Sequence, residues 1–546
     1  MNATTVSVII PSAGHAESLQ GCLDSLRAQA IEGGIEVVVV LDGSAAARNE
    51  GVLRLRAREG WPWTLRWIDL DARRGPAAAR NRGAAEARGR YFIFLDDDMI
   101  ADPDFVAAHL ESLAQNPNTA IIGAIKTRLV GYGGAYRYWI ERFWEQRHQR
   151  LTRELVTNFD ECFSGNLAMA AEVARRIGGF DESIPTCEDV ELGLRLQREG
   201  MRLQYGARAL AIQQFRKSPS DNMRDGVVRG ATVAKLWRKY PEARRVFTFA
   251  APSQGSFYGR WLRKRALDSR RRWESMASAL PWLPGMKLTE FLGGFLYNVA
   301  AARGARSGFG DEDQWAALTE GTAVLCYHRF CAAGEKRSKF AIAKERFAGE
   351  LEVLASAGYR FATLRELIEA RNHDEVLSGR TAIVTFDDCM AELIEIAAPM
   401  LRSMGVPAVA YVVRDSIGKP GYLSADQIRA LMREGWEIGS HSLSHPRLSS
   451  VPPQRRHHEI AISRSALAEI TGSPPDTFAY PYGTRDSAIE RMVQDAGYAA
   501  AFGIDMGCVH LHSSPWSLPR FVIDGRWPLW LFKLVVLGGV RWRGLP

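Results

Sequence analysis

Two acidic motifs, each placed directly after a run of apolar residues, limit most strongly the folds that this chain can adopt. Asp96-Asp97-Asp98 follows the run from Tyr91 to Leu95, and Asp387-Asp388 follows the run from Ala382 to Phe386. Short apolar runs of this kind are typical of buried strands, and open α/β sheets bind ligands beyond the carboxyl ends of their strands. The sequence therefore predicts two α/β units, each with an acidic site at a strand end.

Size, charge and cysteine content narrow the class of protein. A chain of 546 residues is too long for one hydrophobic core and predicts about two to four domains. The net charge of +8 favours anionic partners such as nucleotide phosphates or an acidic membrane surface. The seven cysteines include no CxxC pair, which indicates a reducing compartment and argues against a disulfide framework or a cysteine-based zinc site.

The sequence shows neither a signal-peptide pattern nor a membrane span. The N-terminus has no basic region, and Val6–Pro11 already has the character of a buried strand. A membrane span needs roughly 18 uninterrupted apolar residues, and the best candidates, Leu280–Ala302 and Pro528–Val540, are short or interrupted by charged residues. We therefore expect a cytoplasmic protein, with peripheral contact at the inner face of the membrane as an open alternative.

Strand-like runs and helical patterns alternate along the first part of the chain. We expect strands over residues 6–11, 35–41, 63–70 and 91–95, and helices over residues 16–30 and 74–89. Such β-α-β alternation predicts a mostly parallel sheet. Asp42, at the end of the second strand, and Asp96–Asp98, called the acidic triplet below, would then face one crevice.

This arrangement suits a nucleotide-sugar site. An aspartate after a strand can accept a hydrogen bond from a nucleobase or a ribose, and a second carboxylate can hold a divalent cation against the pyrophosphate. A separate carboxylate must remove the proton from the acceptor hydroxyl, and Glu188-Asp189, before the expected helix Val190–Gly200, is the candidate. Taken singly, a solvated turn would explain the acidic triplet, and helix N-terminal charge would explain Glu188-Asp189.

Residues 5–240 resemble the family 2 glycosyltransferases through an ordered series of motifs: Pro11, Asp42-Gly43-Ser44, Arg80-Asn81-Arg82-Gly83, Leu95-Asp96-Asp97-Asp98, Gly165-Asn166, Gly178-Gly179-Phe180-Asp181 and Glu188-Asp189-Val190-Glu191-Leu192. The resemblance implies a Rossmann-like GT-A fold, an inverting mechanism, a UDP-linked or similar sugar donor, and Mg²⁺ or Mn²⁺. It makes Asp98 the metal ligand and Asp189 the general base. It assigns the nucleotide-sugar site to Pro11, Asp42, Arg80, Asp96, Asp97 and Glu188, with Asp42 on the base.

One departure from the family bears on the product. Processive members usually carry Gln-x-x-Arg-Trp after the general base, whereas Gln213-Gln214-Phe215-Arg216-Lys217 does not match that motif. The sequence also has no flanking membrane spans that could form an export channel. We therefore expect the transfer of one or a few sugars to a carbohydrate or lipid-linked acceptor.

Residues 246–318 match neither half, and we expect a basic helical linker between domains at 1–245 and 319–546. Cations and apolar residues alternate in one part of it: Arg260, Trp261, Leu262, Arg263, Lys264, Arg265, Leu267, Arg270, Arg271, Arg272 and Trp273. A solvated helix that packs its tryptophans on a neighbouring domain and contact with an anionic membrane both explain this pattern. Nucleic-acid binding is disfavoured, because no nucleic-acid motif accompanies the cations. Gly304–Asp313 is the expected connection into the second half.

Strand and helix patterns alternate again in the second half. We expect strands over residues 323–328, 382–386, 408–413, 436–440 and 477–480, and helices over 344–357, 364–370, 390–404, 424–434, 453–471 and 485–496. Repeated strand–helix units fit a (β/α) barrel better than an open sheet. Active sites of such barrels collect at the carboxyl ends of the strands, where Asp387, Asp388 and His441 fall.

The second acidic motif and two histidines predict metal-assisted hydrolysis. Asp388 with His441 and His445, which are four residues apart, is a ligand set for Zn²⁺ or a similar divalent ion with positions open for water. Such an ion acidifies water and polarises a carbonyl, while a neighbouring carboxylate takes the proton of the water. Amide hydrolysis also needs a donor to the oxyanion, which a turn amide at Pro481-Tyr482-Gly483 can provide.

Residues 320–525 resemble the polysaccharide deacetylases of carbohydrate esterase family 4, also called the NodB homology domain. The motifs that carry the resemblance are Thr385-Phe386-Asp387-Asp388, His441-Ser442-Leu443-Ser444-His445-Pro446 and, less closely, Phe478-Ala479-Tyr480-Pro481-Tyr482-Gly483. The resemblance makes Asp387 the general base, and Asp388, His441 and His445 the metal ligands. Tyr482 then supplies the amide for the oxyanion. The implied reaction removes an N-acetyl group from an N-acetylhexosamine.

The deacetylase-like half also departs from the family. Cys389 stands where glycine is usual, and Ala479 stands where many members carry an arginine that orients the base. No clear late Leu-x-His motif supplies a general acid. His328, on the first strand, and His510 and His512, by their position late in the chain, are the candidates, and a structural or surface role would explain each of them singly.

The two halves together predict a bifunctional enzyme. The first domain would transfer a sugar, with UDP-N-acetylglucosamine as the favoured donor, and the second would deacetylate an N-acetylamino sugar. Fusion would raise the effective concentration of the first product at the second site. Three alternatives stay open: a catalytically inactive second domain that binds carbohydrate, two domains with unrelated substrates, and a membrane-recruited scaffold.

Overall fold

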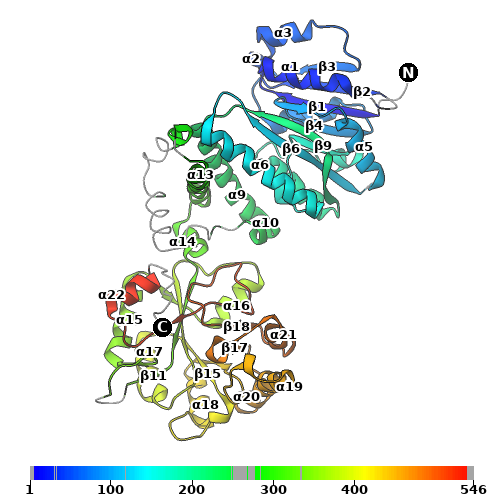
Figure 1. The fold of residues 1–546 in the computed structure, drawn as a ribbon. Coiled ribbons are helices and arrows are strands. Elements are labelled where there is room, and N and C mark those ends of the chain that lie inside the picture. Colours follow the sequence, from blue (N-terminus) through cyan, green and yellow to red (C-terminus); the bar gives the residue numbers. More distant parts are fainter. Residues whose placement is uncertain are drawn as a thin grey trace. The chain divides into compact units, whose positions relative to one another are not determined.

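A computed structural model describes residues 5–29, 31, 34–116, 118–247, 249, 267, 277–282, 285–331 and 335–537. The chain divides into two compact units, which are described separately below: Met1–Glu242 with Ala266–Gly308, and Ala243–Arg265 with Phe309–Pro546 (Figure 1). Of the basic and apolar residues singled out between 260 and 273, only Leu267 lies within the described residues.

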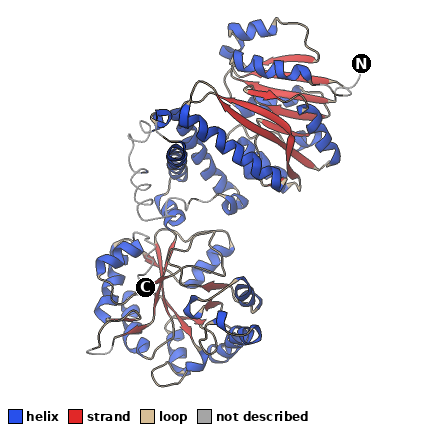
Figure 2. Cartoon of the chain, viewed as in Figure 1, coloured by secondary structure: helices blue, strands red, loops and turns tan. Residues whose placement is uncertain are grey.

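A nine-stranded mixed sheet forms the centre of the first unit (Figure 2). Its strands lie in the order β3 (Thr64–Asp69), β2 (Ile35–Leu41), β1 (Val6–Ser12), β4 (Tyr91–Leu95), β8 (Asn166–Ala170), β6 (Thr119–Leu129), β9 (Arg202–Phe215) and β5 (Met99–Ala101), and β7 (Val156–Thr157) pairs with β9. The first four strands are parallel, whereas β8 is antiparallel to both of its neighbours. β1 and β2 are buried along their whole length, which explains their nearly unbroken apolar sequences.

The helices of the first unit are α1 (Ala16–Ser25), α2 (Ser44–Ala47), α3 (Glu50–Arg56), α4 (Pro76–Glu86), α5 (Phe105–Gln115), α6 (Gly134–Glu154), α7 (Ala171–Arg176), α8 (Glu188–Arg198), α9 (Pro219–Lys239) and α13 (Met286–Phe309). α1 buries Leu19 and Leu23, as its helical spacing predicts. α4 begins with Pro76, whose fixed φ suits the first helical position, after Gly75 at φ +92°. None of the described helices combines the length and apolar character that crossing a bilayer requires.

Helix α13 packs closely against α9, and glycines permit the approach. A Cβ atom added to Gly304 would lie 1.8 Å from the backbone oxygen of Val227, and one added to Gly230 would lie 1.9 Å from the backbone oxygen of Ala301. The expected connection Gly304–Asp313 contains the boundary between the two units, after Gly308, but its first residues are the last turns of α13. The missing side chain of Gly304 serves helix packing and not the flexibility of a loop.

A curled parallel sheet forms the centre of the second unit. Its strands lie in the order β18 (Ala500–Phe502), β17 (Thr477–Ala479), β16 (Glu437–Ser440), β15 (Ala408–Val412), β14 (Thr381–Phe386), β10 (Thr322–Tyr327) and β19 (Phe521–Val522), and β13 (Arg360–Phe361) pairs with β14. A bridge between Phe502 and Leu518 connects β18 with the segment that leads into β19. β11 (Arg329–Phe330) and β12 (Ala341–Ile342) form a separate small pair. This arrangement confirms the predicted α/β fold of the NodB homology type.

The helices associated with the second unit are α10 (Pro241–Val246), where the chain passes from one unit to the other, α14 (Glu312–Glu320), α15 (Lys344–Ser356), α16 (Leu364–Asn372), α17 (Ala398–Met404), α18 (Ala425–Arg433), α19 (Pro453–His457), α20 (Ser463–Thr471), α21 (Ser487–Asp495) and α22 (Leu529–Phe532). Capping boxes begin α16 and α18, which makes their starting points readable in the sequence. α14 belongs to this unit and nearly all of α13 to the first, so the segment expected as a linker is divided between the two units.

A buried carboxylate on α15 lies against the first strand of the curled sheet. Glu350 is 0% exposed. It accepts hydrogen bonds from the hydroxyl of Tyr327 at 3.0 Å and from Nε of Arg346 at 2.9 Å. Burial raises the pKa of Glu350 to about 7, although Arg346 and Tyr327 oppose the rise. The protonation of Glu350 is therefore linked to the stability of this unit.

We expect Glu350→Gln to flatten the pH dependence of the stability of the second unit. Because the pKa of Glu350 is raised in the folded state, its contribution to stability is fully present below the unfolded pKa of about 4.3 and is lost as the pH rises through about 7. Between about pH 5 and pH 8 the wild type should lose about 2–3 kcal/mol more than the variant. Calorimetric unfolding across this range measures the difference. Glu345→Gln, an exposed position on the same helix, should follow the wild type, and a Glu350→Gln that also followed it would contradict the prediction.

Candidate active sites

The acidic triplet follows β4, and its carboxylates have different surroundings. Asp97 accepts a hydrogen bond of 2.5 Å from the hydroxyl of Ser12, and Asp98 accepts one of 3.1 Å from the amide of Gln213. The other oxygen of Asp98, Oδ1, is buried and has no hydrogen-bond partner among the described residues. Burial, together with the negative charges of Asp96 and Asp97, raises the pKa of Asp98 to about 7. Burial also raises the pKa of Asp97, to about 6. An orphaned carboxylate oxygen next to two further carboxylates fits a hard divalent cation.

Arg80, on α4, joins the acidic triplet to the Glu188-Asp189 motif. Its side chain is 4% exposed. The guanidinium donates hydrogen bonds of 2.7 Å to Asp96 and of 2.7 Å to Glu188. The structure thus brings together three residues expected in the nucleotide-sugar site. Because Arg80 binds both residues, it fixes the start of α8 at Glu188 relative to the end of β4 at Asp96.

Backbone amides hold the two other carboxylates of this unit. Asp189, in the first turn of α8, accepts a hydrogen bond of 3.2 Å from the N–H of Ser164. Asp42 accepts hydrogen bonds of 2.7 and 3.0 Å from the N–H groups of Arg74 and Gly75. Pro11 lies on β1, between the strands that end at Asp42 and at the acidic triplet. Two strand spacings, about 10 Å, therefore separate the backbone at Asp42 from the backbone at the acidic triplet.

Asp388, His441 and His445 come together at the carboxyl ends of β14 and β16. Nε2 of His445 lies 3.3 Å from Oδ1 of Asp388 and 3.2 Å from Nε2 of His441, which lies 3.7 Å from the same carboxylate oxygen. Nδ1 of His441 lies 2.7 Å from the carbonyl oxygen of Ala479. When Nδ1 of His441 carries the proton and donates it to that carbonyl, the lone pair of its Nε2 is directed at Asp388 and His445. Two imidazole nitrogens and one carboxylate oxygen, all within 4.8 Å of one another, fit Zn²⁺ or a similar ion.

Asp387 is paired with an arginine that the sequence analysis did not single out. Arg520 is 0% exposed and donates one hydrogen bond to each carboxylate oxygen of Asp387, at 2.7 and 2.8 Å. Its Nε donates to the carbonyl oxygen of Gly503 at 3.1 Å, which fixes the plane of the guanidinium. Burial alone would raise the pKa of Asp387, but Arg520 and His441 outweigh burial and hold the pKa well below its usual range. Asp387 is therefore ionised at neutral pH.

Nothing in the local sequence identifies Arg520. It lies 133 residues after Asp387 in the chain, in the segment between Leu518 and β19. It stands directly before the apolar run Phe521-Val522-Ile523, and that position alone does not indicate a partner. Ala479 leaves the usual position of the orienting arginine without a cation, and Arg520 reaches Asp387 from the segment directly before β19.

The backbone around this site adopts conformations that side chains rarely permit. Among the described residues eight that are not glycine have a positive φ, and five of these belong to the site: Asp388, Cys389, Ser442, His445 and Tyr482. Each such conformation costs about 1–3 kcal/mol and persists only where the surroundings impose it. Cys389 has a φ of 56°, which glycine adopts without strain and which explains why glycine is usual there.

Tyr482 lies at the rim of the site. Its side chain is 48% exposed. The centroid of its ring is 4.7 Å from that of His445, and the guanidinium of Arg447 lies 4.3 Å from the ring centroid. The turn Pro481–Gly483 therefore places the ring of Tyr482 beside one of the expected metal ligands.

The structure brings one of the three candidate proton-donating histidines to this site. The ligand atoms of His328 and Asp387 lie within 4.8 Å of each other, and Nδ1 of His328 is buried without a hydrogen-bond partner among the described residues. His510 lies against Gly321, directly before β10, so the length of that strand, about 17 Å, separates it from the catalytic end. His512 follows in the same loop, and the charged groups that act on it are Arg371 and Asp374, which do not belong to the site.

Comparisons with known proteins find relatives of both halves. Residues 7–177 match the family model described as Glycosyl transferase family 2, and residues 374–501 match the one described as Polysaccharide deacetylase. The chain is 31% identical over 147 residues to the Uncharacterized glycosyltransferase YfnE of Bacillus subtilis, which covers 27% of this chain and 35% of YfnE. It is 21% identical over 209 residues to the Poly-beta-1,6-N-acetyl-D-glucosamine N-deacetylase of Staphylococcus aureus, which covers 36% of this chain and 72% of that protein.

Among solved structures, the mannosyltransferase PcManGT of Pyrobaculum calidifontis, in complex with GDP-Man and Mn²⁺, aligns with 55% of this chain and 87% of its own, at a TM-score of 0.39 and 18% identity. The two family matches cover different parts of the chain, and each contains one of the two acidic motifs. The chain therefore carries an N-terminal family 2 glycosyltransferase domain and a C-terminal polysaccharide deacetylase domain, as a fusion of the two.

Proposed function

We propose that the chain is a bifunctional enzyme. The first domain transfers an N-acetylhexosamine from a nucleotide sugar to a carbohydrate or lipid-linked acceptor, and the second removes the acetyl group from an N-acetylamino sugar. The observation that carries the proposal is the ionised Asp387 beside the set of Asp388, His441 and His445. The Staphylococcus aureus relative is named as an N-deacetylase of poly-N-acetylglucosamine, which supports this class of substrate.

In the transferase step, the acceptor hydroxyl displaces the nucleotide from the opposite face of the anomeric carbon, so the configuration inverts. Asp189 accepts the proton of that hydroxyl, in an orientation maintained by the N–H of Ser164. Asp42 binds the base or ribose, and Asp96 orients the nucleotide. Mg²⁺ or Mn²⁺, held by Asp98, supplies positive charge that offsets the charge of the leaving diphosphate.

In the deacetylase step, Asp387 takes a proton from the attacking water. Arg520 keeps the carboxylate ionised and fixes its direction. The N–H of Tyr482 donates to the amide oxygen as negative charge develops there. His328 gives a proton to the leaving nitrogen, and acetate and a free amine result. A zinc-type ion, held by the Asp388 set, supplies Lewis acidity for the water and the carbonyl.

Asp387→Asn should abolish acetate release and leave nucleotide release intact. The amide cannot accept the proton of water, and loss of a general base lowers the rate by about 10²–10⁴-fold. Incubation of the purified full chain with nucleotide sugars and N-acetylglucosamine oligosaccharides, with acetate and UDP measured together, provides the test. Asp426→Asn, at an exposed position on α18, is the control. Acetate release that persists in Asp387→Asn would remove the base from this mechanism.

Asp189→Asn should give the reverse pattern. Nucleotide release in the presence of acceptor should fall by about 10²–10⁴-fold, because no other carboxylate takes the acceptor proton. Acetate release from a preformed oligosaccharide should stay at the wild-type rate. Asp104→Asn, exposed before α5, controls for the loss of a surface charge. Equal loss of both activities would indicate damage to folding instead of loss of the proposed base.

Arg520→Lys tests whether the arginine positions Asp387. A lysine keeps the positive charge but cannot bind both carboxylate oxygens through a planar fork. We expect kcat for acetate release to fall by at least about tenfold, with an unchanged KM and an unchanged content of bound metal. Arg526→Lys is the matched control, because Arg526 also binds both oxygens of an aspartate, Asp524, but on the surface. A merely structural role would lower the unfolding temperature of Arg520→Lys without changing kcat.

The same measurements separate the alternatives. UDP release without acetate release on any N-acetylamino sugar would favour a second domain that only binds carbohydrate. Neither product, together with binding to liposomes that survives loss of both sites, would favour a membrane-recruited scaffold. The described geometry favours catalysis, because a module that only binds sugar does not need a buried aspartate kept ionised by an arginine.

A further inference from the structure

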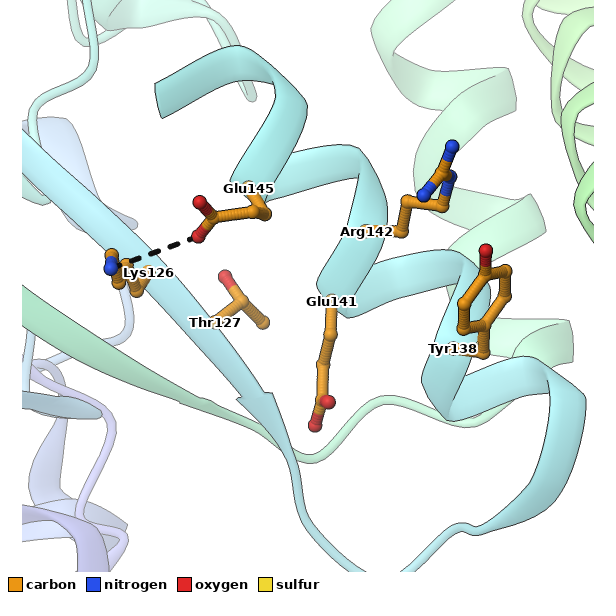
Figure 3. A pocket seen from close by; sticks show the side chains of 6 residues that line it. All are labelled: Lys126, Thr127, Tyr138, Glu141, Arg142 and Glu145. Atoms are coloured by element: carbon orange, nitrogen blue, oxygen red, sulfur yellow. Dashed lines mark ion pairs between the residues drawn. The ribbon is translucent and has the colours of Figure 1, made fainter. Parts of the chain in front are cut away.

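A cavity of about 400 Å³ lies between β6 and α6 in the first unit. It is lined by two residues of the strand, Lys126 and Thr127, and by four of the helix: Tyr138, Glu141, Arg142 and Glu145 (Figure 3). None of the six belongs to the motifs of the nucleotide-sugar site. Its volume falls within the range of small-molecule sites, about 300–1,000 Å³. The cavity can therefore hold a ligand other than the nucleotide sugar.

The strand wall of the cavity adjoins the expected cation ligand. Thr127 pairs with Gln213 on the neighbouring strand β9, and its hydroxyl lies 3.5 Å from the amide oxygen of Gln213. The amide nitrogen of Gln213 in turn donates to Asp98 at 3.1 Å. One side chain therefore separates the cavity from Asp98.

The helix wall of the cavity is fixed to the loop that holds the expected general base. Trp144, on α6, packs edge-on against Phe163 with a centroid distance of 5.4 Å, and the residue after Phe163 donates its N–H to Asp189. Arg147, one turn further along α6, forms an ion pair of 2.7 Å with Glu161, and both side chains are mostly buried. The cavity thus lies beside the supports of both Asp98 and Asp189.

The lining suits a neutral ligand with many hydroxyl groups. Lys126 and Arg142 offset Glu141 and Glu145, so the side chains of the lining have no net charge, whereas recognition of a diphosphate requires an excess of cations. Glu141 already accepts a hydrogen bond of 3.0 Å from the N–H of Leu129, and Arg142 pairs with Glu290 at 3.3 Å and lies 5.6 Å from the ring centroid of Tyr138. Glu145 can accept from hydroxyls, Lys126 can donate to them, and Tyr138 adds a flat ring. Lys126 and Glu145 are 45% and 43% exposed and only 3.8 Å apart, so this edge of the cavity is open to solvent.

We propose that this cavity is the acceptor subsite of the transferase and that it binds a neutral oligosaccharide. The inference rests on the proposed transferase function. An oligosaccharide bound between β6 and α6 would present a hydroxyl toward Asp189, while the nucleotide sugar occupies the crevice at the ends of β1, β2 and β4. Acceptor recognition then depends on residues outside the motifs that bind the donor.

Two cavity variants test the inference in the full chain. The probe is a linear tetramer of N-acetylglucosamine, with UDP-N-acetylglucosamine and Mn²⁺, in an Asp387→Asn background that keeps the probe acetylated. Tyr138→Ala and Glu145→Gln should each raise the KM for the tetramer by at least about tenfold, a change typical for loss of one good contact. The KM for the donor should change by less than about twofold. Arg153→Ala, exposed in the last turn of the same helix, is the matched control and should leave both constants unchanged.

The outcomes distinguish failure of this inference from failure of the proposed function. A tetramer that does not stimulate UDP release, or cavity variants with an unchanged KM for the tetramer, would overturn the acceptor subsite while the slow hydrolysis of donor alone still shows an active transferase. Absence of UDP release from the donor, with and without the tetramer, would overturn the transferase function and the inference with it.

Discussion

A buried carboxylate must be matched by a cation or by N–H and O–H donors, and both units of this protein are built around that requirement. In the first unit Arg80 lies between Asp96 and Glu188, and in the second Arg520 binds both oxygens of Asp387. Removing one partner from such a pair costs about 3–5 kcal/mol, because a buried charge stays behind. The two arginines therefore decide which carboxylates are fixed inside the protein and which remain to hold a cation.

Backbone strain completes the arrangement in the second unit. His441 and His445 are four residues apart, yet no helix turn brings them together, because they lie in the loop after β16. Left-handed conformations at Ser442 and His445 fold that loop back, so that the two Nε2 atoms lie 3.2 Å apart. The strain persists because the end of β16 that carries the loop, Gly439-Ser440, is buried and holds the loop in place. The site is thus held in place by the sheet and not by local propensity.

Local sequence patterns were sufficient to predict part of this structure. The expected strands at 35–41 and 91–95 agree with β2 and β4, because parallel strands buried on both faces are nearly continuous apolar runs. The Asp388 set was also recognisable, since its members lie in two short motifs. Arg520 was not, because its partner is 133 residues away and a contact of that kind has no local signal. The role of Gly304 in helix packing was not recognisable either, because a glycine that permits helix packing looks the same in sequence as one in a loop.

The donor atoms at the two sites differ, and that difference has a chemical consequence. The acidic triplet offers only carboxylate oxygens, among them the orphaned Oδ1 of Asp98, and such sets favour hard ions such as Mg²⁺ and Mn²⁺. The Asp388 set offers two imidazole nitrogens and one carboxylate, which favour Zn²⁺ and its neighbours in the Irving–Williams order. Oxygen-only and nitrogen-rich sites select different ions from the same medium. The two proposed reactions have different needs, charge compensation on a diphosphate and activation of water, and each donor set suits one of them.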